Sequence, residues 1–225
     1  MNYDETNFTN DPSKSIIICR RGRKRVETVR ESSKQAFSVM WCGSASGELL
    51  PPMVVYKAKN VYEGWEENGP EGAVYDCTES GWFDSNSFKV WFTHLFLPSV
   101  ADRRGPILLF GDNLTSHFSW ELVMLARKHQ VYFVMLIANG TNWLQVLDVA
   151  VFAPMKRSWR LILTKWRNAS RRVGDIPKEV FPSLLNELNV EIRQDQKVEE
   201  ALRNGFRACR GSYGHILFSP FRSED

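Results

Sequence analysis

The chain combines short apolar runs, which are typical of strands, with longer segments whose apolar residues recur every three or four positions. Two β-rich runs lie within residues 35–58 with a turn at 43–47 between them, which predicts an antiparallel hairpin. Residues 106–112 and 131–137 are short and mostly apolar, as expected of strands that are buried on both faces of a sheet.

Three segments have the spacing of amphipathic helices. The first follows an N-cap at Asp84 or Ser85 and ends near Pro98. The second begins at Ser119, and the third is a long helix that begins near Asp148. Because strands alternate with helices after the hairpin, we predict an α/β fold in which a mixed sheet is flanked by helices on both faces.

The pattern changes after Arg172, where residues 177–188 and 196–208 predict two further helices. We therefore divide the chain into a domain at residues 1–172 and a helical C-terminal extension at residues 173–225. The extension is expected to pack on the domain through Phe181, Leu184, Leu185, Leu188, Leu202 and Phe206. At the other end only three residues precede Asp4, so we expect a truncated first strand that ends at this aspartate.

Composition limits the class of protein. A chain of 225 residues can bury a sizeable core, and its 43% hydrophobic and 24% charged residues exclude wholesale disorder. The four cysteines show no CxxC spacing, so a cysteine zinc site is not expected, and reduced thiols are. No apolar run approaches the ~20 residues of a membrane span, and no signal peptide opens the chain, which predicts a soluble protein that acts inside the cell.

Basic residues are concentrated in two segments, although the net charge is only +3. One lies within residues 19–30 and the other within 156–172, and either could bind nucleic-acid phosphates or form a solvated surface. The candidate nucleic-acid-binding residues are Arg20, Arg21, Arg23, Lys24, Arg25, Lys156, Arg157 and Arg160.

Three aspartates stand next to the predicted strands and helices. Asp4 lies on the first strand, Asp112 follows the apolar run at 106–111, and Asp148 begins the long helix. Aspartate often ends strands and caps helices, which is the ordinary explanation. However, strand ends in an α/β sheet meet at one edge, and three carboxylates there can hold Mg²⁺ or Mn²⁺. Two such ions can promote cleavage of a phosphodiester.

The segments around these aspartates resemble the three catalytic motifs of DDE-superfamily transposases of the pogo and Tigger group, the DDE_1 endonuclease domain. They read NYDETNF, LLFGDNLTSHFS and TNWLQVLDVAVFAPMKRSWR, and the segments between them are also similar to that family. The resemblance identifies Asp4, Asp112 and Asp148 as the catalytic and metal-ligating residues. It implies an RNase H-like catalytic domain at residues 1–172, a two-metal Mg²⁺ or Mn²⁺ site, and DNA cleavage with strand transfer at transposon ends.

The resemblance further implies DNA as the partner and the nucleus as the location. It leaves a homodimer open and implies neither a membrane nor a small-molecule substrate. No helix-turn-helix modules precede Asp4, so we expect a fragment or a transposon-derived copy.

The chain departs from the family pattern just before Asp148. Ile137 and Ala138 replace two prolines, Asn142 replaces a histidine, and Val146 replaces another proline. Loss of prolines is expected to weaken the support of Asp148 by ~1 kcal/mol. A second hypothesis therefore stays open, in which the protein is a catalytically inactive nucleic-acid-binding or interaction protein that retains the fold.

Overall fold

The computed structural model describes residues 1–9, 36–112, 119–136, 141–171 and 175–218. Its strands are β1 (Asn2–Thr9), β2 (Ala36–Gly43), β3 (Met53–Lys57), β4 (Val74–Thr78), β5 (Ile107–Gly111) and β6 (Val131–Met135). They form one mixed sheet in the order β4-β3-β2-β1-β5-β6. The pairs β1–β2 and β2–β3 are antiparallel, whereas β3–β4, β1–β5 and β5–β6 are parallel.

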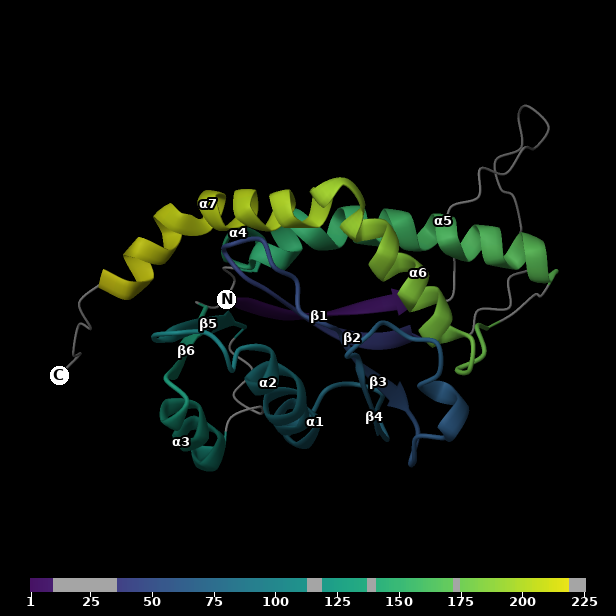
Figure 1. Ribbon diagram of the computed structural model, residues 1–225, viewed down its shortest axis with the longest axis horizontal. Coiled ribbons are helices and arrows are strands. Elements are labelled where there is room, and N and C mark those ends of the chain that lie inside the picture. Colours follow the sequence, from purple (N-terminus) through teal and green to yellow (C-terminus); the bar gives the residue numbers. More distant parts are fainter. Residues whose placement is uncertain (10–35, 113–118, 137–140, 172–174, 219–225) are drawn as a thin grey trace, which may run out of the picture.

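Helices cover both faces of this sheet, as Figure 1 shows. One layer contains α1 (Ser85–Val90), η2 (Trp91–Phe96), α2 (Leu97–Ser99) and α3 (Trp120–Lys128). The other contains α4 (Thr141–Leu144), η4 (Leu147–Val151), α5 (Phe152–Ser170), α6 (Phe181–Arg193), η5 (Gln194–Gln196) and α7 (Lys197–Phe218). A short helix, η1 (Glu63–Trp65), lies between β3 and β4. The predicted α/β architecture is confirmed.

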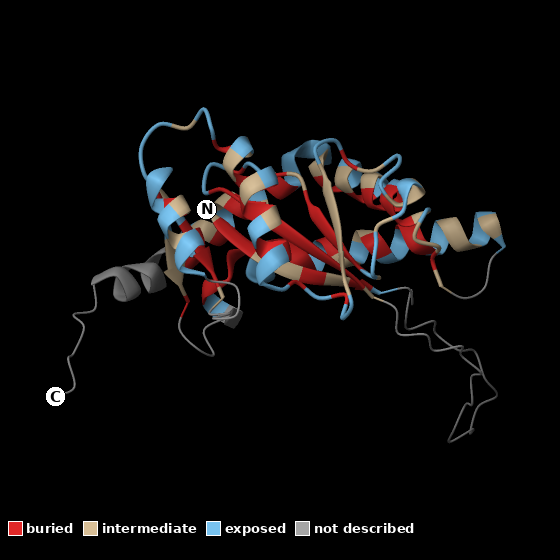
Figure 2. Ribbon diagram, turned by 90° about the horizontal axis from the view of Figure 1, so that it is seen from below, coloured by how far each residue is buried: buried red, intermediate tan, exposed pale blue. Residues whose placement is uncertain are grey.

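Strand β1 contributes side chains to both layers because successive residues of a strand point to opposite faces. Phe8 packs edge-on against Trp159 of α5, with ring centroids 5.1 Å apart. On the other face Tyr3 lies 5.3 Å from the rings of both Phe88 and Trp91. The strands are therefore buried between two layers of helices whose outer sides are exposed, as Figure 2 shows.

The predicted hairpin and the N-cap of the first helix are both confirmed. β2 and β3 pair antiparallel, with Ser38 opposite Val55. Asp84 caps α1, since its side chain accepts hydrogen bonds from the backbone N–H groups of Asn86 and Ser87. The N–H of Asp84 donates in turn to the Ser87 hydroxyl, which completes a capping box.

Two strand predictions need correction. The sequence pattern did not predict strand β4, because it is a half-buried edge strand with neither a continuous apolar run nor a fully buried face. β6 was expected to be buried on both faces, but it forms the opposite edge of the sheet and leaves Tyr132 46% exposed.

Asp4 was expected to end its strand, and that position is also wrong. β1 has eight residues, and its pairing with β2 extends from Asn2 opposite Gly43 to Thr9 opposite Ala36. Asp4 is thus the third residue of the strand. The antiparallel partner holds the strand on both sides of this carboxylate, so Asp4 stands on rigid backbone.

The C-terminal helices share a core with the sheet. Phe181 of α6 stacks on Phe37 of β2, with ring centroids 3.9 Å apart, and Leu202 of α7 fills the space over Gly43. Of the residues predicted to pack there, Phe206 is partly buried and the other five are buried. The expected packing of residues 173–225 on the domain is confirmed for the described part of that segment.

Candidate metal centre

The register of β1 and β5 brings Asp4 and Asp112 onto adjacent positions. These strands are parallel, and Asn2 is the partner of Phe110. Asp4 is two residues after Asn2, and Asp112 is two residues after Phe110, directly after the end of β5. Side chains alternate along extended backbone, so Asp4 and Asp112 share a face with Asn2 and Phe110. That face is the one covered by η4 and α5, because Phe8 and Phe110 belong to the same core cluster as residues of those helices.

Asp148 reaches the same place from η4. It is the second residue of this helical segment and is exposed, whereas its neighbour Leu147 is fully buried. The carboxyl groups of Asp148 and Asp4 interact, since the negative charge of Asp148 raises the pKa of Asp4 and the Asp4 side chain in turn affects the pKa of Asp148. Charge interactions also couple Asp148 to Asp112 and, with opposite sign, to Lys156. In the structure, Asp4 and Asp148 therefore interact directly. Asp112 is connected to them by the pairing of β1 with β5 and by its charge interaction with Asp148.

Two buried amide side chains connect β1 to the segment that leads into η4. Asn2 Nδ2 donates to Gln145 Oε1 at 2.8 Å and to the Phe110 carbonyl at 3.2 Å. Gln145 Nε2 donates to the Tyr3 carbonyl at 2.9 Å, and the Leu147 N–H donates to Asn2 Oδ1 at 3.1 Å. The Gln145 side chain also interacts with the Asp4 carboxyl and lowers its pKa. Sequence reasoning missed both amides.

Burial and like charge raise the pKa values of the acidic groups. The pKa of Asp4 is raised to about 7, first by burial and then by the negative charge of Asp148. Hydrogen bonds from the Gln145 side chain and the Glu5 N–H partly oppose this rise. Partial burial also raises the pKa of Asp148, while Lys156 acts in the opposite direction. A positive charge placed among these groups would favour their ionised forms.

The donor chemistry of these groups suits a hard divalent cation. Carboxylate oxygens are the ligands that Mg²⁺ and Mn²⁺ prefer, and Asp4 and Asp148 are close enough for each to shift the pKa of the other. Among the residues that the structure describes, no group of three or more His, Cys, Asp or Glu side chains lies close enough to hold an ion. The Asp4–Asp148 pair thus fits part of a metal site, and a centre with all three aspartates stays a prediction.

Glu5, next to Asp4 in the sequence, belongs to the opposite face of β1. Burial raises its pKa to about 7. The Glu5 backbone N–H donates to Asp4 Oδ1 at 2.9 Å, and the charge of its side chain contributes to the raised pKa of Asp4 from the other face of the strand.

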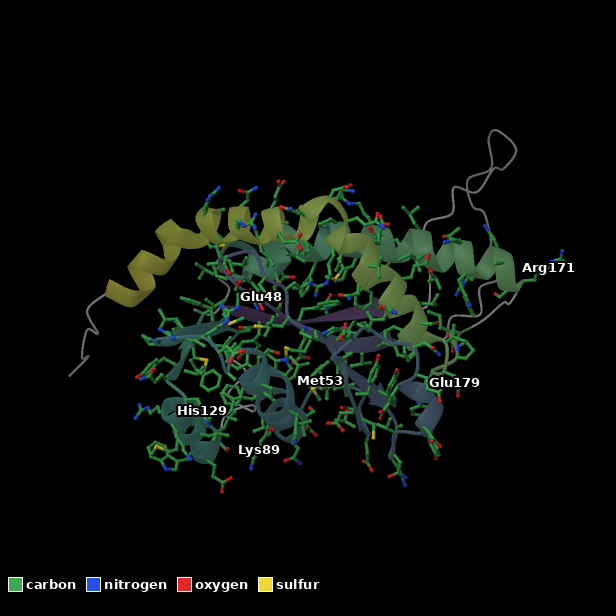
Figure 3. The ribbon with its side chains drawn as sticks, viewed as in Figure 1. Glu48, Met53, Lys89, His129, Arg171 and Glu179 are labelled. Carbon is green, nitrogen blue, oxygen red and sulfur yellow. The ribbon has the colours of Figure 1, made fainter. Side chains whose placement is uncertain are left out.

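The candidate phosphate-binding residues on α5 lie beside the carboxylates. Lys156 interacts with the charge of Asp148, and its Nζ stands 5.9 Å from the centre of the Phe152 ring. Arg157 and Arg160 are exposed on the same helix. The helix ends at Ser170, and the side chain of its C-cap residue, Arg171, points away from the molecule in Figure 3. The other candidates, Arg20, Arg21, Arg23, Lys24 and Arg25, lie outside the described residues.

Comparison with protein families gives a match to the DDE superfamily endonuclease domain over residues 34–199, well over half of the chain. The matched segment contains Asp112 and Asp148 and begins after Asp4. The assignment of Asp4 to the same site therefore depends on the structure, namely its interaction with Asp148 and the pairing of β1 with β5, which Asp112 follows.

Curated proteins with similar sequences include a protein named Pogo transposable element with KRAB domain, from Mus musculus. It is 23% identical over 216 residues, covering 92% of this chain and 34% of that protein. A Cochliobolus lunatus protein named MFS-type transporter clz9 is 25% identical over 145 residues, covering 62% of this chain and 15% of that protein. The chain thus spans about a third or less of these relatives. No helix in the described part of this chain is long and apolar enough to cross a membrane.

Among solved structures, the Mos1 transposase in its paired-end complex with the left transposon end has a similar fold. The TM-score is 0.60 at 12% sequence identity, and the match covers 97% of this chain and 54% of that one. The predicted RNase H-like fold is thereby confirmed, together with the resemblance to DDE transposases.

Proposed function

Because this chain belongs to the DDE superfamily endonuclease family, we propose that it is the catalytic domain of a metal-dependent DNA endonuclease of the transposase type. Its reaction would be cleavage of a phosphodiester at the ends of a pogo-like element, followed by strand transfer. The observation that carries the proposal is the interacting pair of Asp4 and Asp148, with Asp112 directly after the strand next to β1.

In this proposal the three aspartates are the ligands of Mg²⁺ or Mn²⁺. A divalent cation held by carboxylates neutralises charge on a phosphodiester and activates the attacking water or hydroxyl group. The chain supplies rigid support for its ligands, since Asp4 stands within an eight-residue strand and Asp112 directly follows one. Asp148 is fixed through its buried neighbour Leu147, whose N–H donates to Asn2.

We further propose that α5 binds the DNA backbone next to the cleavage site. Lys156 is electrostatically coupled to Asp148, so the basic side of α5 begins at the carboxylates. Arg157 and Arg160 extend it along the exposed side of the helix, where guanidinium groups can pair with phosphates. The segment that contains Arg20 to Arg25 would add a second basic contact. A nuclear location is part of the same proposal, because the DNA substrate would be chromosomal.

The experiment is a nicking assay on supercoiled plasmid DNA with Mn²⁺ or Mg²⁺. Asp112→Asn keeps the side-chain shape but removes an anionic ligand, so nicking should fall by about 100-fold or more. DNA binding, measured separately by fluorescence anisotropy, should be unchanged or slightly tighter, because a negative charge is lost near the phosphates. Asp4→Asn and Asp148→Asn should behave in the same way.

Asp102→Asn is the matched control, because it makes the same chemical change at an exposed position after α2. It should nick at the wild-type rate. Nicking by Asp112→Asn at the wild-type rate would contradict the assigned role of that residue.

A second candidate function is DNA binding without cleavage. It is favoured by the lack, within the described residues, of a group of three side chains able to hold a metal ion, and by the replaced prolines near Asp148. Experiments on the wild-type protein distinguish the two functions. Binding of DNA with no nicking in either cation would establish the second function and reject the first.

A further inference from the structure

The amides of Asn2 and Gln145 are completely buried, although neither takes part in the proposed chemistry. Together they connect β1 with the end of β5 and the start of η4, where Phe110 and Leu147 lie 108 and 145 residues after Asn2. Buried amides must be hydrogen-bonded to avoid a large desolvation cost, and both side chains meet that requirement. Such a cluster holds its segments in one specific arrangement.

The direction of every hydrogen bond in this cluster is fixed by backbone groups. Asn2 Oδ1 faces an N–H group, that of Leu147, so its Nδ2 must be the atom that faces the Phe110 carbonyl. Gln145 Nε2 faces the Tyr3 carbonyl, which leaves its Oε1 to accept from Asn2. Neither amide can be rotated by half a turn without placing two donors or two acceptors together.

Stability alone does not require this arrangement. A buried amide pair contributes little net free energy relative to apolar side chains of the same shape, because both groups lose their hydrogen bonds to water on folding. The pair instead fixes the orientation of the groups to which it is hydrogen-bonded. Gln145 donates to the carbonyl of Tyr3, and its side chain also stabilises the ionised carboxyl of the next residue, Asp4. It lies three positions before Asp148, close to one helical turn.

We propose that the Asn2–Gln145 amide pair is the positioning device of the metal site, fixing the Asp4 carboxyl on β1 and the start of η4, which carries Asp148, in the spacing that a divalent cation needs. This inference rests on the proposed function, since it assigns these residues to the same site. Asn2 and Gln145 are positioning residues and touch neither the cation nor the DNA. Their effect passes through the two carboxylates.

The test uses two substitutions that preserve the volume of Gln145. Gln145→Glu puts an oxygen against the Tyr3 carbonyl and the Asp4 carboxyl, and Gln145→Met removes all the hydrogen bonds of the side chain. Isothermal titration with Mn²⁺ should show a dissociation constant raised by about 10- to 100-fold in both variants, as is usual when the support of metal ligands is lost. The nicking rate at saturating DNA should fall, whereas the KM for DNA should stay unchanged because Gln145 is buried.

Ser38→Ala is the matched control for a merely structural effect. Ser38 is a buried polar residue of the same sheet, and its hydroxyl donates to the Gly81 carbonyl at 2.7 Å, away from the aspartates. Its loss should lower the melting temperature without changing Mn²⁺ affinity or the nicking rate of the folded protein. A purely structural role of Gln145 would give the same result as this control.

A measurement on the wild-type chain keeps the inference testable if both Gln145 variants fail to fold. Hydrogen exchange followed by mass spectrometry should show the Leu147 amide protected, with exchange slowed further by Mg²⁺. A peptide from α6 reports on general stabilisation and should change less. Equal exchange at Leu147 with and without Mg²⁺, in protein that binds the ion, would overturn the inference.

The outcomes separate the two proposals. If wild-type protein nicks DNA and both Gln145 variants match its Mn²⁺ affinity and rate, the positioning role is rejected while the endonuclease function stands. If wild-type protein binds neither Mn²⁺ nor Mg²⁺, the endonuclease proposal fails first and the positioning role fails with it. Weakened metal binding in the Gln145 variants alone, with Ser38→Ala at wild-type affinity, supports the inference.

Discussion

Gly111 occupies the position between the apolar part of β5 and Asp112. The ring of Tyr3, from the adjacent strand, fills the space that a Cβ at residue 111 would need. Tyr3 in turn packs on Phe88 and Trp91, which prevent it from moving aside. At the residue scale, the backbone before Asp112 can therefore lie close to β1 only because glycine has no side chain.

Gly111→Ala should lower the free energy of unfolding by about 1–3 kcal/mol, as is typical of overpacked cores. Urea denaturation followed by circular dichroism measures it. Gly64→Ala is the control, since a Cβ there would have Glu179 Cγ as its nearest neighbour at an ordinary 3.7 Å. Equal stability of Gly111→Ala and wild type would show that the Tyr3 ring can be displaced at no cost.

At the scale of elements, the site depends on the close approach of α7 to η4. Gly205 of α7 faces Val146 and Ala150, and a Cβ at residue 205 would stand 2.9 Å from side-chain carbons of both. Helix α7 thus packs closely against the segment that carries Asp148. The C-terminal helix supports the carboxylate face from behind, although none of its residues belongs to the proposed metal site.

Gly205→Leu should lower the melting temperature even though leucine has the better helix propensity by about 1 kcal/mol, because overpacking between α7 and η4 costs more. Differential scanning calorimetry provides the measurement. The control is Asn204→Leu at the adjacent, exposed position of the same helix. If both variants are equally stable, α7 does not pack closely against η4 as described.

At the scale of the whole molecule, the sheet needs both helical layers. Two separate core clusters cover its faces, and one of them includes buried residues of α6 and α7 as well as of β1 and β2. The ring centroid of Phe181 lies within 6.2 Å of the ring centroids of Phe37, Tyr56 and Trp159. The extension is therefore part of the covering on the carboxylate face.

Removal of residues 173–225 should expose this apolar face and reduce solubility. The expected signs are increased binding of the dye ANS, a lower melting temperature and association in size-exclusion chromatography. Wild-type protein under the same conditions is the reference. A truncated chain that keeps the wild-type melting temperature and stays monomeric would show that α6 and α7 are an independent appendage.

The sequence by itself determined which segments are strands and helices wherever one face of the element is deeply buried. The long helix and the capped helix at Asp84 could be predicted from the spacing of their apolar residues, because burial of one helix face imposes a period of 3.6. The strand before Asp112 could be predicted from its short apolar run. Edge strands escape this rule. β4 is only half-buried, so its alternation is weak, and β6 could not be recognised as an edge because strand order is not written in local spacing.

The three aspartates were selected from their local setting and family resemblance, but their relation in space was decided by tertiary structure. The interaction between Asp4 and Asp148, and the hydrogen bond between the buried amides of Asn2 and Gln145, join positions more than 140 residues apart. Such contacts arise when β1 enters the sheet between β2 and β5 and η4 packs across it. No local pattern encodes them, because the partner that satisfies a buried polar group is known only once the sheet order and register are fixed.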